Sequence, residues 1–237
     1  MNYINSWDND TRSASYAKLE FPNTYHLAYR DLPEIIMKHA RGTKVLDFGC
    51  GTGRSTRFLK KLEFDVTGID ISHSMIRQAV EKDPDGTYIL VEDGNYDAIP
   101  NGFDLITSIF TFDNIPAQKR AKILLGLKPK LSRNGCMIML DSNPKLYHKE
   151  WASFSTAPFP GNKIAKTGDP VYTIMNDVDD KTPVEDYFFT EADYLNLFEE
   201  AGMKLLKRYA PLGQRDEPFM WKSELTIAPW IIYVLGV

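Results

Sequence analysis

Short runs of apolar residues alternate with segments of helical periodicity from residue 44 to residue 141. Apolar runs of about four to eight residues are typical of buried strands, whereas longer segments with apolar residues every three or four positions are typical of helices. The alternation therefore indicates βα units that build a parallel sheet. The expected strands cover residues 45–48, 66–69, 88–91, 103–110 and 136–140, and the expected helices cover residues 54–62, 72–81 and 117–131.

The hydrophobic pattern extends this prediction toward both ends of the chain. Residues 23–40 are expected to be helical ahead of the first strand. Thr190 is expected to cap a helix that ends at Ala201, because acidic residues occupy its first turn and a glycine follows its end. Residues 204–209 and 229–235 are expected to form two closing strands.

Residues 142–186 differ from the segments on either side of them. They are rich in aromatic residues, Pro, Gly and Asp, and they show few helical or strand periods. An irregular stretch of this length inside a domain is usually a functional lid or binding loop, or it is disordered. The aromatic residues argue against disorder, so we expect a lid.

Composition and charge narrow the class of protein. The 237 residues include 28 basic and 32 acidic side chains, which give a formal net charge of −4. Proteins that bind nucleic acids usually present a basic surface to the phosphates, so no nucleic-acid partner is expected. Only Cys50 and Cys136 are cysteines, which suits a reducing compartment.

Neither end of the chain carries a membrane or export signal that we recognise. Residues 1–8 lack both the basic and the apolar parts of a signal peptide. Residues 227–237 are the most apolar stretch, but they are too short to span a bilayer and include Pro229. We therefore expect a cytoplasmic protein with no membrane partner.

A glycine-rich motif follows the first expected strand and opens the first helix: residues 47–54 read D-F-G-C-G-T-G-R. Glycines at alternate positions permit a tight bend and let the backbone approach a ligand closely. A nicotinamide cofactor would prefer G-x-G-x-x-G, but Arg54 and Thr56 stand where the third glycine would be. Asp47, just upstream, suits a cofactor with a cationic ammonium and sulfonium better than a pyrophosphate.

Further acidic residues follow the next two expected strands. Asp70 ends the second strand, where a carboxylate can accept hydrogen bonds from both ribose hydroxyls. Asp93 follows the third strand and could accept a hydrogen bond from an adenine amino group. The carboxyl ends of neighbouring parallel strands line the crevice in which open α/β sheets bind ligands, so these acids are expected to converge there.

Together these segments resemble the class I methyltransferases that depend on S-adenosylmethionine (SAM). The resemblance covers residues 44–141 and, more loosely, the helix and strands after Thr190. It implies a doubly wound, Rossmann-like α/β fold with a seven-stranded sheet, whose last strand is antiparallel and is formed by residues 229–235. The matching motifs are residues 45–53, 68–72, 93–94 and 103–106.

The resemblance suggests one domain over residues 1–237, divided into four parts. The expected parts are an N-terminal helical cap (1–43), a SAM-binding core (44–141), a lid insert after the fifth strand (142–188), and a closing helix and strands (189–237).

The resemblance also implies where SAM lies and that S-adenosylhomocysteine is the product. The glycines would lie under the methionine part, Asp70 on the ribose and Asp93 on the adenine. Ile109 and Phe110, at the end of the fourth strand, would sit beside the transferred methyl group. The expected cofactor-binding residues are Asp47, Gly49, Cys50, Gly51, Gly53, Asp70, Ile71, Asp93, Gly94, Ile109 and Phe110.

Methyl transfer from a sulfonium is an in-line displacement, so the protein mainly has to align the reacting atoms. The four histidines show no metal-ligand spacing, and no metal is expected. No catalytic residue is assigned: the candidates are His148, Asp113 and Tyr29, although a solvated loop position would explain His148 and core packing would explain Tyr29. The candidate acceptor-binding residues are Tyr16, Tyr25, Arg30, Asn114 and Trp151.

The sequence thus predicts an enzyme that transfers a methyl group from SAM to an oxygen or nitrogen atom of a small molecule. Three alternatives stay open: a nucleotide-dependent oxidoreductase on a similar sheet, a non-catalytic SAM-binding regulator, and a methyltransferase with an RNA or protein substrate. The sequence identifies neither the methyl acceptor nor the oligomeric state.

Overall fold

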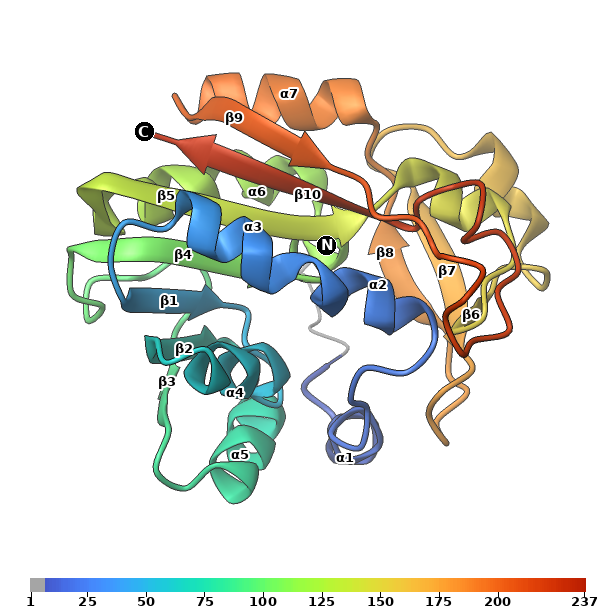
Figure 1. Ribbon diagram of the computed structural model, residues 1–237, viewed down its shortest axis with the longest axis horizontal. Helices are drawn as coiled ribbons and strands as arrows, with labels where there is room; N and C mark the ends of the chain where they lie inside the picture. The colour runs from blue at the N-terminus through green and yellow to red at the C-terminus, as the bar shows by residue number, and fades with distance from the viewer. Residues whose placement is uncertain (1–6) are drawn as a thin grey trace.

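A seven-stranded sheet with the order β3-β2-β1-β4-β5-β10-β9 forms the centre of the computed structural model, which describes residues 7–237 (Figure 1). Strands β1 to β5 pair in parallel, and β10 runs antiparallel to both of its neighbours. The predicted fold, including its antiparallel last strand, is therefore confirmed. The strands are β1 (Lys44–Phe48), β2 (Asp65–Asp70), β3 (Thr87–Leu90), β4 (Phe103–Ile109), β5 (Leu131–Ser142), β9 (Lys204–Tyr209) and β10 (Trp230–Gly236).

Successive side chains of the central strands enter two separate cores, one on each face of the sheet. Val45 of β1 packs with the helices of the N-terminal segment. Leu46 packs on the opposite face, with the helices that cover residues 117–127 and 191–200. This alternation follows from the two-residue period of a strand. The helices are α1 (Asp10–Tyr16), α2 (Thr24–Arg30), α3 (Leu32–His39), α4 (Arg54–Lys61), α5 (His73–Lys82), α6 (Ala117–Leu127) and α7 (Glu191–Glu200).

The expected caps of two helices are present. The Ser72 hydroxyl accepts a hydrogen bond from the backbone N–H of Met75 at the start of α5. Thr190 and Asp193 form a reciprocal capping box at the start of α7. Such caps satisfy backbone groups that a helix end would otherwise leave unpaired. None of the helices within residues 7–237 is long and apolar enough to cross a membrane.

Two predicted boundaries were wrong, and both lie beside β5. Helix α6 ends at Leu127 rather than residue 131, because Pro129 cannot continue an α-helix and a 3₁₀ turn (Lys128–Lys130) replaces its last turn. Strand β5 begins at Leu131 rather than residue 136. The Asn134–Gly135 turn signal lies inside it, where the register with β4 shifts.

The insert also differs from the prediction, because residues expected to be irregular form a second sheet. This three-stranded antiparallel sheet has the order β6-β7-β8. Its strands are short, and Pro170 and polar residues in alternate positions hide the strand period in the sequence. Its elements are β6 (Phe154–Ser155), β7 (Pro170–Met175) and β8 (Val184–Tyr187), with 3₁₀ turns at Pro144–His148 and Pro160–Ile164.

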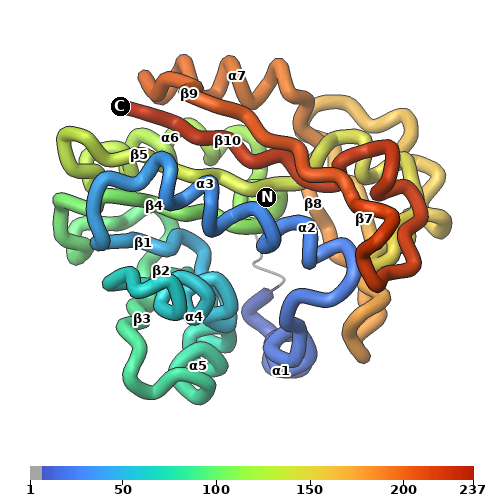
Figure 2. The backbone as a smooth tube through the Cα atoms, in the orientation of Figure 1, coloured from blue at the N-terminus to red at the C-terminus, as the bar shows by residue number. Residues whose placement is uncertain are grey.

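The insert shares a core with the N-terminal helices and the last strand. Trp151 is fully buried and donates its indole N–H to the carbonyl of Leu146 at 2.8 Å. Phe154 packs against Tyr25 of α2 and Trp230 of β10, with ring centroids 5.2 and 5.5 Å apart. Figure 2 shows β7 and β8 beside α2 and the loop that precedes β10. Buried packing of this kind indicates a fixed part of the fold.

Candidate functional site

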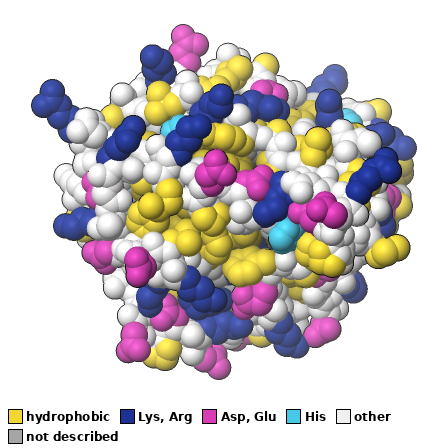
Figure 3. All heavy atoms as spheres, viewed as in Figure 1, with side chains coloured by type: hydrophobic (Ala, Val, Ile, Leu, Met, Phe, Trp, Pro, Cys, Tyr) yellow, Lys and Arg dark blue, Asp and Glu magenta, His cyan; other side chains and the backbone are white. Residues whose placement is uncertain are grey.

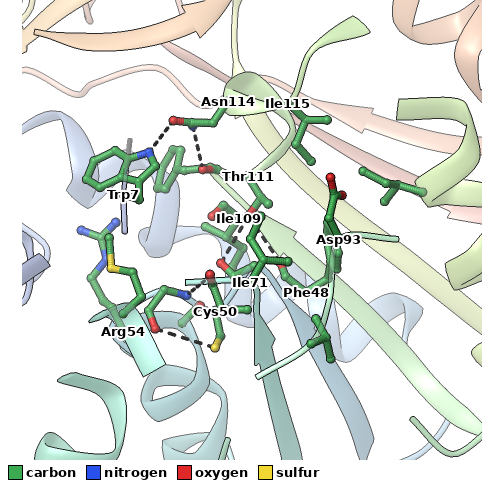
Figure 4. Close-up of a pocket in the computed structure, with 18 of the residues that line it drawn as sticks. Trp7, Phe48, Cys50, Arg54, Ile71, Asp93, Ile109, Thr111, Asn114 and Ile115 are labelled. Atoms are coloured by element: carbon green, nitrogen blue, oxygen red, sulfur yellow. Dashed lines mark hydrogen bonds between the residues drawn. The ribbon is translucent and has the colours of Figure 1, made fainter. Parts of the chain in front are cut away.

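A cavity opens where β1, β2 and β4 end, and its lining is mostly apolar (Figure 4). This is the crevice at the carboxyl ends of the strands, where the sequence placed a ligand. Its lining residues are Trp7, Tyr16, Tyr29, Phe48, Gly49, Cys50, Gly51, Arg54, Ser55, Asp70, Ile71, Met75, Val91, Asp93, Tyr96, Ile109, Phe110, Thr111, Asn114, Ile115, Pro116, Lys119 and Ile123.

The glycine bend between β1 and α4 forms the floor of the cavity. Gly49 and Gly51 have φ angles of 69° and 53°, in the left-handed region that favours glycine. A Cβ atom on Gly49 would lie 2.3 Å from Thr111, so the fold itself requires a glycine there. A Cβ atom on Gly51 would meet only the Met75 sulfur, at 3.9 Å. The bend therefore presents bare backbone to the cavity at Gly51.

Asp70 joins the end of β2 to this bend. Its carboxylate accepts hydrogen bonds from the backbone N–H groups of Gly51 and Ser72, both at 2.9 Å. Burial raises the pKa of the Asp70 carboxyl, although these two hydrogen bonds act in the opposite direction. The residue lines the cavity, where its carboxylate can accept a further hydrogen bond.

Asp47 lies beneath the bend and does not line the cavity. Its carboxylate accepts hydrogen bonds from the side chains of Ser55 (2.6 Å), Thr56 (2.7 Å) and Thr107 (2.9 Å). It is fully buried, and burial raises its pKa. Asp47 thus ties the first turn of α4 to β1 and β4, which supports a bracing role for this acid.

The two ends of the cavity differ in character. At one end, Asp93 pairs with Lys119. Figure 4 places Trp7 and Arg54 at the other end, far from Asp93. We call the first the acidic end and the second the aromatic end. The aromatic end is lined by Trp7, Tyr16, Tyr29, Arg54 and Phe110.

The aromatic end contains a residue with a strained backbone and hydrogen bonds that hold the N-terminal segment. Phe110 follows β4 with a φ angle of 58°, which is rare for an aromatic residue, and its backbone N–H donates to Leu140 at 2.8 Å. The Trp7 indole N–H donates to the side-chain oxygen of Asn114 at 2.6 Å. Asp8, next in the chain, accepts a hydrogen bond from the backbone N–H of Ser74 at the start of α5. The N-terminal segment is therefore held against the cavity.

Comparison with known proteins agrees with this architecture. The family described as "Methyltransferase domain" matches residues 45–135. A demethylmenaquinone methyltransferase of Thermotoga maritima is 30% identical over 132 residues, which cover 50% of this chain and 57% of that protein. The family match and this relative support the assignment of the chain to the class I SAM-dependent methyltransferases. They support SAM as its cofactor in the same way.

Solved methyltransferase structures share the fold over nearly the whole chain. The CcbJ methyltransferase from Streptomyces caelestis has a TM-score of 0.69 at 14% identity, with 99% of each chain covered. A SAM-dependent methyltransferase from Clostridium acetobutylicum has a TM-score of 0.62 at 16% identity, with 93% of each chain covered. At such identities the likeness concerns the fold alone, and it extends to the insert and the N-terminal helices.

Most residues that the motifs assigned to SAM line the cavity of this methyltransferase, and three do not. Asp47 is buried below the bend, Gly53 precedes α4 with a φ angle of 75°, and Gly94 lies outside the lining. The expected SAM-binding residues in the lining are Gly49, Cys50, Gly51, Asp70, Ile71, Asp93, Ile109 and Phe110.

The candidates for acceptor binding and catalysis divide in the same way. Tyr16, Tyr29 and Asn114 line the cavity. Tyr25 lies in the core behind it, and Arg30 forms ion pairs with Asp31 and Glu217 instead.

The remaining candidates belong to other surroundings. Trp151 is in the core of the insert, and none of residues 142–188 is in the lining, so the expected lid lies elsewhere in the fold. His148 stacks on Phe188 with ring centroids 6.0 Å apart. Asp113 is buried, where it accepts hydrogen bonds from the backbone N–H and the hydroxyl of Ser142.

Sequence reasoning missed several lining residues. Arg54 stood in the first motif but received no role, and only its position as the first residue of α4 could have drawn attention to it. The others follow strand ends, where side chains can face the crevice, or lie on the next helix. The residues missed are Arg54, Met75, Val91, Tyr96, Thr111, Ile115, Pro116, Lys119 and Ile123, with Phe48 and Ser55 beside the bend.

Proposed function

We propose that this methyltransferase transfers the methyl group of SAM to an oxygen or nitrogen atom of a small-molecule acceptor. The observation that carries the proposal is the pairing of the half-buried Asp70 carboxylate with the Gly51 bend on one wall of the cavity. A SAM-sized ligand needs an acceptor for ribose hydroxyls next to a stretch of unobstructed backbone, and these two residues supply both.

The lining supports a single orientation for the cofactor. Asp70 would accept the ribose hydroxyls, and Asp93 at the acidic end would accept the adenine amino group. The bend at Gly49 and Gly51 would pass beside the methionine part. Bound SAM supplies an activated methyl group, so the protein's own task is to align the acceptor with it.

The acceptor would occupy the aromatic end, beside Phe110. None of the described lining residues is a histidine, and burial keeps the pKa of the Tyr29 phenol raised, so Tyr29 stays protonated at neutral pH. Alignment, rather than a strong general base, therefore explains the chemistry that this lining can support.

Surface charge also favours a small acceptor over a nucleic acid. Figure 3 shows basic and acidic side chains intermixed over the face seen in Figure 1. The net charge of −4 would repel a phosphate backbone. The oxidoreductase alternative loses its support because the family and the glycine pattern both indicate SAM.

Isothermal titration with S-adenosylhomocysteine tests the proposed site. Asp70→Ala should weaken binding by at least about tenfold, because it removes the only cavity-lining acid of β2. Asp70→Asn keeps one acceptor oxygen and should give an affinity between those of the wild type and Asp70→Ala. The control is Asp65→Ala, which changes an exposed acid at the far end of the same strand and should leave affinity unchanged.

Two outcomes would reject the proposal. One is equal affinity of the wild type and Asp70→Ala for S-adenosylhomocysteine, and the other is tight binding of NADH without binding of S-adenosylhomocysteine. Incubation with methyl-labelled SAM and a metabolite extract then tests transfer, because a non-catalytic binding module would leave every metabolite unlabelled. The labelled product would show whether oxygen or nitrogen is methylated.

A further inference from the structure

Arg54 is a buried cation at the aromatic end of the cavity. It is the first residue of α4, its side chain is among the lining residues, and it is only 5% exposed. Figure 4 shows it below Trp7, at the opposite end of the cavity from Asp93. A charged group in such a position needs partners that stabilise it.

No acid in the described part of the chain supplies such a partner. None of the ion pairs formed within residues 7–237 includes Arg54. Its guanidinium contacts neutral oxygens instead: it donates to the Tyr16 hydroxyl at 2.8 Å and the Glu20 carbonyl at 2.9 Å, and the Tyr29 hydroxyl also lies within hydrogen-bonding reach. Arg12, which is also buried, lies 3.6 Å from the carboxylate of Asp180. Arg54 thus lacks the kind of partner that its buried neighbour has.

Aromatic rings surround the Arg54 guanidinium. Ring faces attract a cation, and they hold it in place without neutralising its charge. The guanidinium also has five N–H donors, and its contacts with Tyr16, Glu20 and Tyr29 leave donors for a ligand. The described rings nearest its central carbon are Tyr25 (4.7 Å), Tyr16 (5.2 Å), Tyr29 (5.5 Å) and Phe110 (5.8 Å).

Phe110 gives an independent indication that this end of the cavity is functional. It contributes a ring to the cage while its backbone holds a φ angle of 58°. Strain of this kind persists where the surrounding structure maintains it, and such positions cluster at binding sites. Trp230 and Tyr25 fix the Phe110 ring, with centroids 4.6 and 5.5 Å away.

We propose that Arg54 binds a carboxylate of a ligand in the cavity. A carboxylate matches the planar fork of a guanidinium, and its charge would compensate a cation that the described residues leave without an acid. The inference rests on the proposed function, which puts SAM and a small acceptor in this cavity. The carboxylate can come from the methionine part of the cofactor or from the acceptor, and these sources respond differently to the same substitution.

The cofactor arm compares two nucleosides by titration calorimetry. S-adenosylhomocysteine carries the amino-acid carboxylate, and 5′-methylthioadenosine keeps the adenosine and thioether without it. If Arg54 holds the cofactor carboxylate, Arg54→Gln should weaken the binding of S-adenosylhomocysteine by at least about tenfold. The same substitution should weaken the binding of 5′-methylthioadenosine by less than about twofold. The control is Lys61→Gln, which removes an exposed positive charge at the far end of α4, outside the lining.

The acceptor arm uses benzoate and its neutral amide, benzamide, with S-adenosylhomocysteine already bound. If Arg54 holds an acceptor carboxylate, the wild type should bind benzoate at least about tenfold more tightly than benzamide. Arg54→Gln should abolish that preference and leave the affinities for both nucleosides unchanged. Arg54→Lys, which keeps the charge but loses the fork, should retain part of the preference in either arm.

The inference is overturned if Arg54→Gln leaves nucleoside affinities unchanged and the wild type shows no Arg54-dependent preference for benzoate. Thermal melts of both variants establish folding, and Arg54→Lys carries both arms if Arg54→Gln does not fold. A wild type that fails to bind S-adenosylhomocysteine would reject the proposed function itself. A wild type that binds it, with no effect of either substitution in either arm, would reject only the role of Arg54.

Discussion

Arg54 and Arg120 are both buried arginines, and they differ in what surrounds them. Arg120, on α6, is fully buried and lies near three buried acids, Asp113, Asp141 and Asp186. It donates to the carbonyls of Ile115 at 2.8 Å and Tyr187 at 3.2 Å. Arg54 is surrounded by aromatic rings and neutral oxygens, and it lines a cavity.

The difference separates a structural charge from an available one. Arg120 connects α6, the turn after β4 and strand β8, and three buried carboxyl groups lie near enough to interact with its charge. Its ring contacts, to Phe189 at 4.2 Å and Tyr194 at 5.6 Å, close it off from solvent. The groups that act on the Arg54 charge within residues 7–237 are tyrosines rather than carboxyl groups. Burial alone does not tell the two roles apart, whereas the sign and position of the nearest charges do.

The largest expected effect comes from Arg120→Gln. Removing the cation leaves buried acids and backbone carbonyls without their partner, which costs about 3–5 kcal/mol of the free energy of unfolding. For a protein of this size that corresponds to a fall in Tm of roughly 10 °C. Differential scanning calorimetry measures it, and Arg54→Gln should lose less than half as much. Equal losses from the two substitutions would erase the distinction between the two arginines.

The acids around Arg120 predict an unusual dependence of stability on pH. Burial, followed by the nearby charge of Asp113, raises the pKa of Asp186 to about 8. Between its ordinary pKa of 3.8 and this value, the unfolded chain has lost the proton that the folded chain keeps. Stability should therefore fall as pH rises through this window, with a slope of up to about 1.4 kcal/mol per pH unit.

Asp186→Asn isolates this contribution, since the amide oxygen can still accept the hydrogen bond that the Tyr147 hydroxyl donates at 3.1 Å. Urea unfolding at pH 5, 6, 7 and 8 should give a shallower slope for the variant than for the wild type. Some slope should remain, because burial also raises the pKa values of Asp113 and Asp141. Identical slopes would mean that Asp186 titrates near its ordinary pKa in the folded protein.

The contrast also explains which parts of the site the sequence could predict. The bend at Gly49 and the acid at Asp70 lie on one strand–bend–helix–strand segment, so adjacent residues encode their arrangement. The surroundings of Arg54 come from α1, α2 and the end of β4, which are far apart in the sequence. The motif revealed the residue but could not reveal its neighbours.

The same reason accounts for the errors in the fold. The parallel strands are short, mostly apolar runs between turn residues, so the sequence alone could predict them. Strand β7 instead alternates buried and half-buried residues and includes Thr173 at a buried position, which breaks the apolar pattern. The insert is stabilised by contacts of Trp151 and Phe154 with distant elements. Tertiary packing therefore decided its structure, and local sequence gave little sign of it.

The smallest expected effect, and the finest test of the comparison, is Tyr16→Phe. The substitution keeps the ring over Arg54 and removes the hydroxyl that accepts its hydrogen bond. The ligand-free protein then holds one more unpaired guanidinium donor, at a cost of about 1 kcal/mol. A ligand carboxylate that takes over this donor would restore the loss. The ligand held by Arg54 should therefore bind as tightly as to the wild type, or up to about fivefold tighter.

Tyr25→Phe is the control, because that hydroxyl contacts the Met175 sulfur rather than Arg54. Weaker binding in Tyr16→Phe alone would show that the ligand contacts the Tyr16 hydroxyl, and the vacant donors of Arg54 would then not be what recognises it.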